Sequence, residues 1–214
     1  MLFLFHFLQF IAFIPLRIVY PTRIIGRKNL PKGKCVLSVN HTSSMDAALL
    51  AGYLFEKKYF LAKEELFKHP VRRGFMKVLG GIPVNRENPS LASIKQSLGI
   101  LKNNKKLVVF PEGTRHKDKV AKGELGETKN GVSMFAIKSK APIVPVWINR
   151  RPRPFRLTKI EIGEPYELNE FYDKRLDEPT LKEAGQIMNE KILEIGKKYT
   201  NGKVWHRRNR QDIC

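Results

Sequence analysis

The chain is poor in acidic residues. Twenty Asp and Glu stand against forty Lys and Arg among 214 residues, which gives a formal net charge of +20 at pH 7. An excess of this size indicates an anionic partner, either nucleic acid or an anionic phospholipid membrane. The sequence has no zinc-ligand spacing, no RNA-recognition signature and no basic region followed by heptads. We therefore expect an anionic phospholipid membrane and no nucleic acid.

Cysteine is also scarce. Cys35 and Cys214 are the two cysteines of the chain, and they lie in no paired or metal-like spacing. This excludes a disulfide framework and favours a reducing compartment, and neither residue reads as a catalytic nucleophile. Internal repeats and low-complexity tracts are absent as well. The length is that of one ordinary domain, and the 42% hydrophobic content is enough for a core.

The amino terminus lacks the parts of a secretory signal. The stretch MLFLFHFLQFIAFIPL, Met1–Leu16, has no basic residue before it and no small-residue cleavage site after it. As a helix it would measure about 24 Å, short of the ~30 Å hydrocarbon core. We expect it to enter or lie in one leaflet; a core helix, or a span extended through residues 18–20, are the alternatives. Basic and aromatic residues would then lie at the head groups: Arg17, Tyr20, Arg23, Arg27 and Lys28.

Strand-like and helix-like segments alternate along the rest of the chain. Apolar runs predict strands at residues 34–39, 57–62, 81–85, 105–110, 141–149 and 155–165. Helical spacing predicts a helix from about Ser44, helices over 131–140 and 178–199, and a helix that starts with Asn88 as N-cap and Pro89 at its first position. Residues 64–80 also have helical spacing, and Pro70 inside them predicts either two pieces or a bent helix. This order predicts an α/β fold with a mixed central sheet flanked by helices. Residues 1–28 are the expected membrane-associating segment and 29–214 the folded domain.

Two prolines bear on the position of the predicted strand over residues 141–149 in the sheet. Pro142 and Pro145 lie within the run APIVPVWIN and suggest an edge or irregular position, because proline cannot donate to a sheet ladder. The Gly-rich polar stretch over residues 111–130 predicts a long loop.

His41 and Asp46 lie in NHTSSMD, between a predicted strand and a predicted helix. One interpretation is helix capping, because Ser43 and Asp46 have the spacing of a capping box. The other is proton transfer, in which the carboxylate fixes the tautomer of the imidazole and stabilises the imidazolium. On a regular helix the two residues would not share a face. They can meet only if His41 precedes the helix and folds back over its first turn.

Two further stretches follow predicted strands. In FPEGTR, Pro111 and Gly113 shape a turn, Thr114 offers a hydroxyl, and Arg115 presents a planar fork suited to phosphate. A surface turn with an ion pair between Glu112 and Arg115 is the alternative. In GGIPVNR, the glycines allow close approach of the backbone to a ligand. Arg86 could supply a second cation there, although an exposed arginine after a strand is the simpler interpretation.

The blocks NHTSSMD, GGIPVNR, FPEGTR and APIVPV occur here in the order of the four blocks of the glycerolipid acyltransferases. The chain resembles the bacterial 1-acylglycerol-3-phosphate (lysophosphatidic acid) acyltransferases from about Cys35 to Trp147. It departs from their usual second block at Pro83, where the family commonly has an aromatic or aliphatic residue, while Arg86 is retained. The resemblance makes 29–214 an acyltransferase catalytic domain.

The resemblance implies transfer of a fatty acyl group from acyl-CoA or acyl-carrier protein to the 2-hydroxyl of 1-acylglycerol 3-phosphate, giving phosphatidic acid, with no metal or bound cofactor. His41 would be the general base and Asp46 its orienting partner. Arg86 and Arg115 would bind phosphate, with Lys63 a weaker third. Glu112 would hydrogen-bond the glycerol or support Arg115, and Gly113 and Thr114 could supply oxyanion donors.

The resemblance leaves the acceptor open, and glycerol 3-phosphate or another lysophospholipid is the alternative. Its lipid substrates and the basic surface predict a monotopic or peripheral location on the cytoplasmic face of the cell membrane. The same positive charge would favour an acidic acyl-carrier protein.

Overall fold

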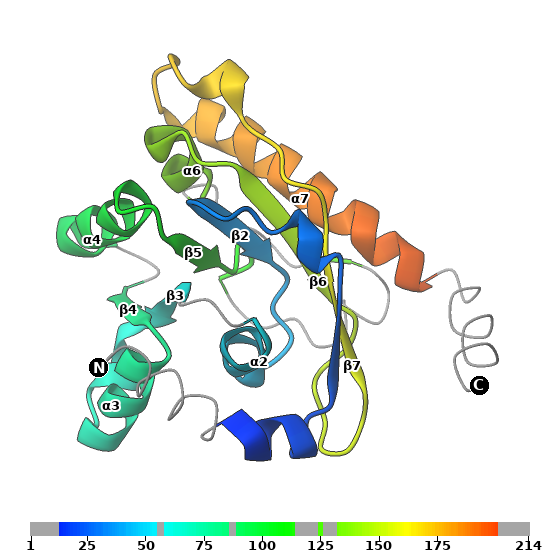
Figure 1. The fold of residues 1–214 in the computed structure, drawn as a ribbon. Coiled ribbons are helices and arrows are strands. Elements are labelled where there is room, and N and C mark those ends of the chain that lie inside the picture. The colour runs from blue at the N-terminus through cyan, green and yellow to red at the C-terminus, as the bar shows by residue number, and fades with distance from the viewer. Residues whose placement is uncertain (1–12, 55–57, 86–88, 114–123, 126–131, 201–214) are drawn as a thin grey trace.

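The structure, a computed structural model, describes residues 13–54, 58–85, 89–113, 124–125 and 132–200 (Figure 1). These residues form an α/β fold with one mixed seven-stranded sheet, in the order β1-β7-β6-β2-β5-β3-β4. The strands are β1 (Thr22–Ile25), β2 (Cys35–Val39), β3 (Lys58–Lys63), β4 (Gly81–Val84), β5 (Lys106–Val109), β6 (Ile143–Ile148) and β7 (Thr158–Ile162). The predicted mixed sheet flanked by helices is confirmed.

The strand directions place five carboxyl ends at one edge of the sheet. Strand β2 pairs in parallel with both β5 and β6, and β3 pairs in parallel with β5 and β4. Strand β7 runs antiparallel to β6 and parallel to β1. The loops that follow β6, β2, β5, β3 and β4 therefore leave the sheet along a common edge, which is where α/β proteins gather their reactive groups.

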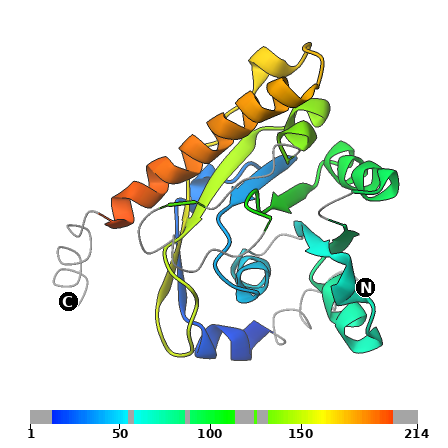
Figure 2. The same cartoon turned by 180° about the vertical axis from the view of Figure 1, so that it is seen from behind.

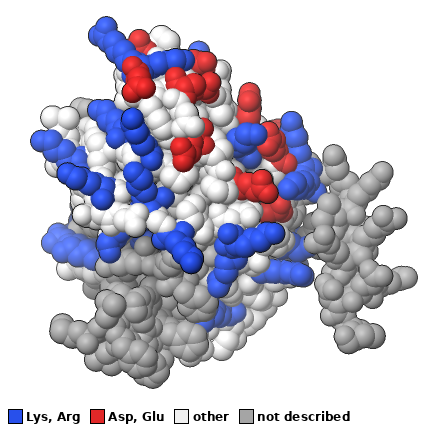
Figure 3. All heavy atoms as spheres, turned by 45° about the horizontal axis from the view of Figure 1, so that its top comes forward, with Lys and Arg blue, Asp and Glu red and all other residues white. Residues whose placement is uncertain are grey.

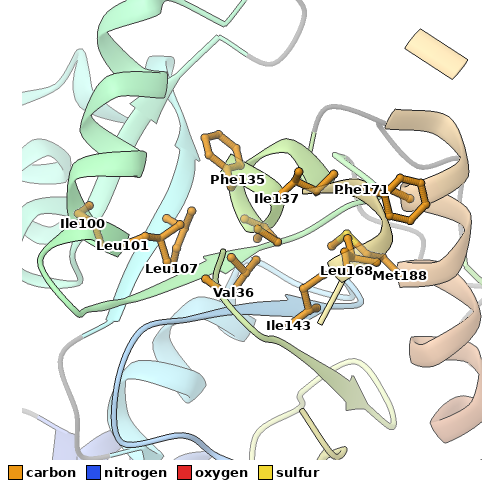
Figure 4. Packing of buried hydrophobic residues seen from close by; sticks show 14 of the residues in the cluster. Val36, Ile100, Leu101, Leu107, Phe135, Ile137, Ile143, Leu168, Phe171 and Met188 are labelled. Atoms are coloured by element: carbon orange, nitrogen blue, oxygen red, sulfur yellow. The ribbon is translucent and has the colours of Figure 1, made fainter. Parts of the chain in front are cut away.

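Helices bury both faces of this sheet. They are α2 (Met45–Tyr53), α3 (Pro70–Val78), α4 (Leu91–Lys102), α6 (Ser133–Ser139), α7 (Glu178–Thr200) and a helix over residues 13–19. On one face Val36, Leu107 and Ile143 pack against α4, α6 and α7 (Figure 4). On the other face Leu37 and Val108 pack against α2, with Leu16 and Tyr20 beside them. Alternate residues of each strand thus enter different cores, which is why these strands appear as continuous apolar runs.

Pro142 and Pro145 suggested an edge or an irregular position for their strand, and the edge position is wrong. Strand β6 lies between β7 and β2, and all six of its residues are buried. Pro145 is tolerated because its main chain faces the end of the β6–β7 ladder, where its carbonyl accepts the N–H of Gly163 at 2.8 Å. The missing N–H of proline therefore falls just beyond the last paired residues, Val146 and Ile162.

Strand β1 was not predicted. Its residues, TRII, lie inside the expected amino-terminal segment 1–28, so the sheet begins within that segment. Four residues are too few for a periodic signal, and the pairing of β1 with β7 depends on a strand more than 130 positions later in the chain.

Within the described part of the chain, no helix is long and apolar enough to cross a membrane. Residues 1–12 lie outside that part, and so does most of the predicted leaflet-associated stretch. Residues 13–19 are helical and pack against α2: a Cβ added to Gly52 would lie 2.7 Å from the ring of Phe13. The membrane association of the amino terminus stays a prediction.

The first residues of α3 and α4 test two predictions made from the sequence. Pro70 is the first residue of α3, after a separate 3-10 turn over Glu64–Phe67, so the division of residues 64–80 into two pieces is confirmed. The predicted N-cap Asn88 is wrong, because α4 begins at Leu91 and is capped by Ser90. The Ser90 side chain accepts the N–H of Ser93 at 3.2 Å. A serine whose hydroxyl faces the first turn of a helix satisfies one of its orphan N–H donors directly.

Candidate active site

His41 and Asp46 meet in the turn between β2 and α2. The strand ends at Val39 and the helix begins at Met45, which leaves five residues to reverse the chain. In this turn His41 Nδ1 lies 2.9 Å from Asp46 Oδ2. His41 is 5% exposed and Asp46 is fully buried. The imidazole precedes the helix and folds back over its first turn, as the proton-transfer interpretation requires.

The Asp46 carboxylate is held by donors from the same turn. Its Oδ2 accepts the backbone N–H groups of Thr42 and Ser43, both at 2.7 Å, as well as the histidine. Its Oδ1 accepts the Thr42 hydroxyl at 2.9 Å. Asp46 also lies in the first turn of α2, where the helix dipole favours a negative charge. These interactions offset the several kcal/mol that burial of a carboxylate costs and fix its orientation.

The capping interpretation is wrong in one part and correct in another. The N-cap of α2 is Ser44, and its side chain makes no capping hydrogen bond. The Ser43 hydroxyl instead accepts the N–H of Met45 at 3.2 Å. Asp46 does accept the N–H of Ser43, which is the reciprocal half of a capping box. The same carboxylate therefore caps the turn and binds the imidazole, so the two interpretations are not exclusive.

The imidazole is also fixed from strand β5. The backbone N–H of His41 donates to Glu112 Oε1 at 2.7 Å, and Glu112 is 2% exposed. The ring of His41 stacks on Phe110, with 4.2 Å between the ring centroids and 26° between the planes. On the opposite side Asn40 exchanges two hydrogen bonds with the main chain of Ile148 at the end of β6, at 2.7 and 3.0 Å. The turn is thus held by both strands that flank β2.

Glu112 lies in a β-turn that directly follows β5. The N–H of Gly113 donates to the carbonyl of Phe110 at 3.0 Å, and Gly113 has a φ of +64°. Proline at the second position and glycine at the fourth suit such a turn. The turn brings the Glu112 carboxylate to the adjacent strand end, where it meets His41.

Of the remaining predicted site residues, Lys63 lies at the same edge. Lys63 is the last residue of β3, is exposed, and pairs with Glu65 at 2.8 Å. This bond holds the pKa of the Glu65 carboxyl below its usual value. Arg86, Thr114 and Arg115 lie outside the described residues. The described segments that precede them in the chain are strand β4, which ends at Val84, and the turn at Gly113.

Sequence reasoning missed several parts of the site. The support of the His41 main chain by Glu112, the stacking of Phe110 and the pairing of Asn40 with β6 were not predicted. The one available signal was the polar run from Asn40 to Ser44 directly after an apolar strand. The partners of that run lie about 70 and 108 positions away, and only the strand order brings them close.

The geometry defines the tautomer that the histidine can use. The carboxylate of Asp46 can only accept, so Nδ1 carries the proton and the lone pair of the neutral ring lies on Nε2. No other described residue hydrogen-bonds the His41 ring in the part of the chain that the structure covers. A histidine held in this way can take a proton through Nε2 and keep the resulting charge beside a buried carboxylate. The chain thus combines an α/β fold with a buried His41–Asp46 pair at the carboxyl edge of its sheet.

The family follows from comparison with known proteins. Residues 21–149 match the family described as Acyltransferase, so the chain belongs to the acyltransferase family. The 1-acyl-sn-glycerol-3-phosphate acyltransferase of Bacillus subtilis is 30% identical over 82% of this chain and 88% of its own length. The chloroplastic relative BAT2 of Brassica napus is 34% identical over 59% of this chain but only 37% of its own length.

A solved structure agrees with this assignment. The crystal structure of the 1-acyl-sn-glycerophosphate (LPA) acyltransferase PlsC from Thermotoga maritima matches with a TM-score of 0.64 and 25% identity, over 90% of this chain and 78% of that one. The resemblance drawn from the sequence motifs and the prediction of an O-acyltransferase are confirmed.

Proposed function

We propose that the chain transfers a fatty acyl group from an acyl thioester to the 2-hydroxyl of 1-acylglycerol 3-phosphate, giving phosphatidic acid. The observation that carries the proposal is the buried His41–Asp46 contact of 2.9 Å at the carboxyl edge of the sheet. The relatives named 1-acyl-sn-glycerol-3-phosphate acyltransferases in Bacillus subtilis and Streptococcus pneumoniae support this choice of acceptor.

The chemistry needs a base because an alcohol has a pKa far above 7. Nε2 of His41 takes the proton of the 2-hydroxyl as the oxygen attacks the thioester carbonyl carbon. The C–O bond forms, the C–S bond breaks, and the leaving thiolate takes the proton back from the imidazolium. Asp46 stabilises the imidazolium and keeps the ring in place. General-base catalysis of this kind contributes about 10²–10⁴-fold in rate.

The phosphate of the acceptor needs a cation near the base. Neighbouring strands lie about 4.8 Å apart, so the end of β5 is one strand from His41, whereas β3 and β4 are about 10 and 14 Å away. The chain that leaves β5 leads to Arg115, which makes this residue the preferred phosphate ligand over Lys63 and Arg86. The ion pair of Lys63 with Glu65 further weakens the case for Lys63.

Attachment of the amino-terminal segment to the cytoplasmic face of the membrane forms part of this proposal, because a lipid acceptor then arrives by lateral diffusion. Deletion of residues 1–12 removes no residue of the described helix over 13–19. We expect this deletion to reduce the membrane-bound fraction in a flotation assay. An unchanged fraction would mean that other residues hold the protein at the membrane.

The test is an acyl-transfer assay with the purified full chain. Lysophosphatidic acid and labelled acyl-CoA or acyl-carrier protein should give labelled phosphatidic acid, and His41→Ala should abolish the product. His69→Ala is the matched control, because His69 is exposed and precedes α3. Glycerol 3-phosphate and other lysophospholipids run in parallel. If one of these acceptors gives a product and lysophosphatidic acid gives none, the proposed acceptor is wrong. Full activity of His41→Ala would reject the assignment of His41 as the general base.

A further inference from the structure

The loop between β6 and β7 presents an aromatic side chain in an unfavourable backbone conformation. It contains a β-turn in which the N–H of Arg156 donates to the carbonyl of Arg153 at 3.2 Å, with Pro154 and Phe155 at the tip. Phe155 has a φ of +56°, a region that glycine or asparagine normally occupies in turns. Phe155 is 75% exposed, so no core packing compensates for this conformation.

This turn is held beside the helix over residues 13–19. The N–H of Phe155 donates to the carbonyl of Val19 at 2.6 Å. Figures 1 and 2 both show the helix and the loop together at the bottom of the molecule. Apolar side chains of both segments are exposed there, namely Ile14, Ile18, Phe155 and Leu157. We call these four residues, with Arg151, Arg153 and Arg156, the turn surface.

The turn surface is strongly basic. All three of its arginines are exposed, and among the described residues no carboxylate pairs with any of them. Arg150 beside them has a pKa below its usual value because of burial and the nearby charges of Arg156 and Arg153. Residues 1–45 and 128–160 contain no Asp or Glu at all, while half of the twenty acidic residues fall within 161–194. Figure 3 shows acidic side chains gathered on one side of the face in view.

The turn surface is joined firmly to the candidate active site. Strand β6, which leads into the loop, ends at Ile148, and this residue is hydrogen-bonded to the side chain of Asn40 next to His41. The helix over 13–19 packs on α2, which carries Asp46, and Arg17 donates to the carbonyl of Gly52 at 2.7 Å. Whatever binds the turn surface is therefore held at a fixed position relative to the carboxyl edge of the sheet.

We propose that the turn surface docks on an anionic phospholipid bilayer, with the apolar side chains in the interface and the arginines at the level of the phosphates. Exposed aliphatic and aromatic side chains among unpaired arginines are the composition of an interfacial membrane contact. The choice of a lipid surface over an acidic protein rests on the proposed function, in which the acceptor is itself a membrane lipid. Docking in this way presents the edge that carries His41 to the leaflet.

The first test measures binding of the full chain to phosphatidylglycerol vesicles by co-sedimentation. The double variant Arg153→Gln/Arg156→Gln should bind about 25-fold more weakly, at about 5-fold per arginine. The control Lys102→Gln/Lys105→Gln removes the same charge from exposed positions at the end of α4 and just before β5, at the opposite edge of the sheet. It should change binding by less than about 2-fold, because distant charges are screened. Equal losses in both variants would reject a local docking surface.

The second test separates docking from folding. Phe155→Gly relieves an unfavourable φ, so the thermal midpoint should stay the same or rise. Vesicle binding should nevertheless fall by at least about 5-fold, because the interfacial ring is lost. A lower midpoint together with unchanged binding would mean that Phe155 serves the fold and would overturn the inference.

The outcomes remain separate from those of the proposed function. With a short-chain, monomeric acceptor, all these variants should turn over at the rate of the starting protein, because none touches the proposed catalytic residues. If the starting protein transfers no acyl group, the proposed function fails while the vesicle result stands by itself. If the arginine variant binds vesicles normally but saturates only at higher acyl-carrier protein concentrations, the surface binds an acidic protein and the lipid inference is wrong.

Discussion

Replacement of Asp46 by asparagine tests the proposed base most directly. The amide oxygen can take the place of Oδ2 and keep its three donors, while the amide nitrogen donates to the hydroxyl of Thr42 in place of Oδ1. The variant should therefore fold, with a stability loss below about 3 kcal/mol, because charged hydrogen bonds become neutral ones while the cost of burying a charge disappears. What is lost is the negative charge beside the imidazolium.

The size of the kinetic effect follows from this geometry. A carboxylate and an imidazolium about 4 Å apart attract each other by about 4 kcal/mol at an effective dielectric constant of about 20. Loss of this attraction in the transition state corresponds to about a 10³-fold lower kcat. His41→Ala should lower kcat by at least the same factor. Because the two residues act as a unit, the double variant should be no slower than His41→Ala alone.

The assay is the saturated rate of phosphatidic acid formation from lysophosphatidic acid and acyl-CoA, with folding followed by thermal denaturation. A loss below about 10-fold for Asp46→Asn, in a folded protein, would refute the role of its charge. If the losses in kcat of the two single variants multiplied in the double variant, His41 and Asp46 would contribute independently, and this too would refute the proposed role.

Further variants test the fold and the phosphate site. Gly80→Ala should destabilise the protein by more than about 1 kcal/mol, because φ is +81° and the new Cβ would lie 2.2 Å from a carbonyl oxygen, whereas Gly74→Ala, with open space in α3, should stabilise it by about 0.5–1 kcal/mol in urea unfolding. Asn40→Leu should cost about 2–4 kcal/mol and lower kcat, because two buried hydrogen bonds to β6 are lost. Asp177 caps α7, and its pKa is held below the usual value of 3.8 by hydrogen bonds from the third residue of that helix. The contribution of the Asp177 carboxylate to folding stability is therefore present above pH 3.8 and lost as the pH falls below this value. The difference in thermal midpoint between the starting protein and Asp177→Ala should accordingly shrink in acid. Arg115→Ala should raise the KM for lysophosphatidic acid with a smaller change in kcat.

The predictions for the glycine, Asp177 and Arg115 variants each have a contrary result. Equal effects at the two glycines would mean that the backbone at the end of α3 is not constrained. A midpoint difference at position 177 that does not vary with pH would show that the carboxylate does not act as the cap. An unchanged acceptor KM after the arginine replacement would assign phosphate binding to another cation.

The helices show what local patterns can predict. A break or bend at Pro70 and the amphipathic run of α7 were predicted correctly, because the effect of proline and helical periodicity are properties of neighbouring residues. Strand β1 was missed, and an edge position was wrongly considered for β6, because strand order depends on which segments pair, and these lie far apart in the chain.

The same division holds for the site. The residues of NHTSSMD determine a turn in which His41 can reach Asp46, because the carboxylate binds donors only three to five positions away. The neighbours of that turn were decided by the tertiary structure: Glu112 and Phe110 on one side and Ile148 on the other reach it only because β5 and β6 flank β2. Short-range hydrogen bonds are encoded by spacing along the chain. Long-range ones follow from burying both faces of the sheet, which is a property of the whole fold.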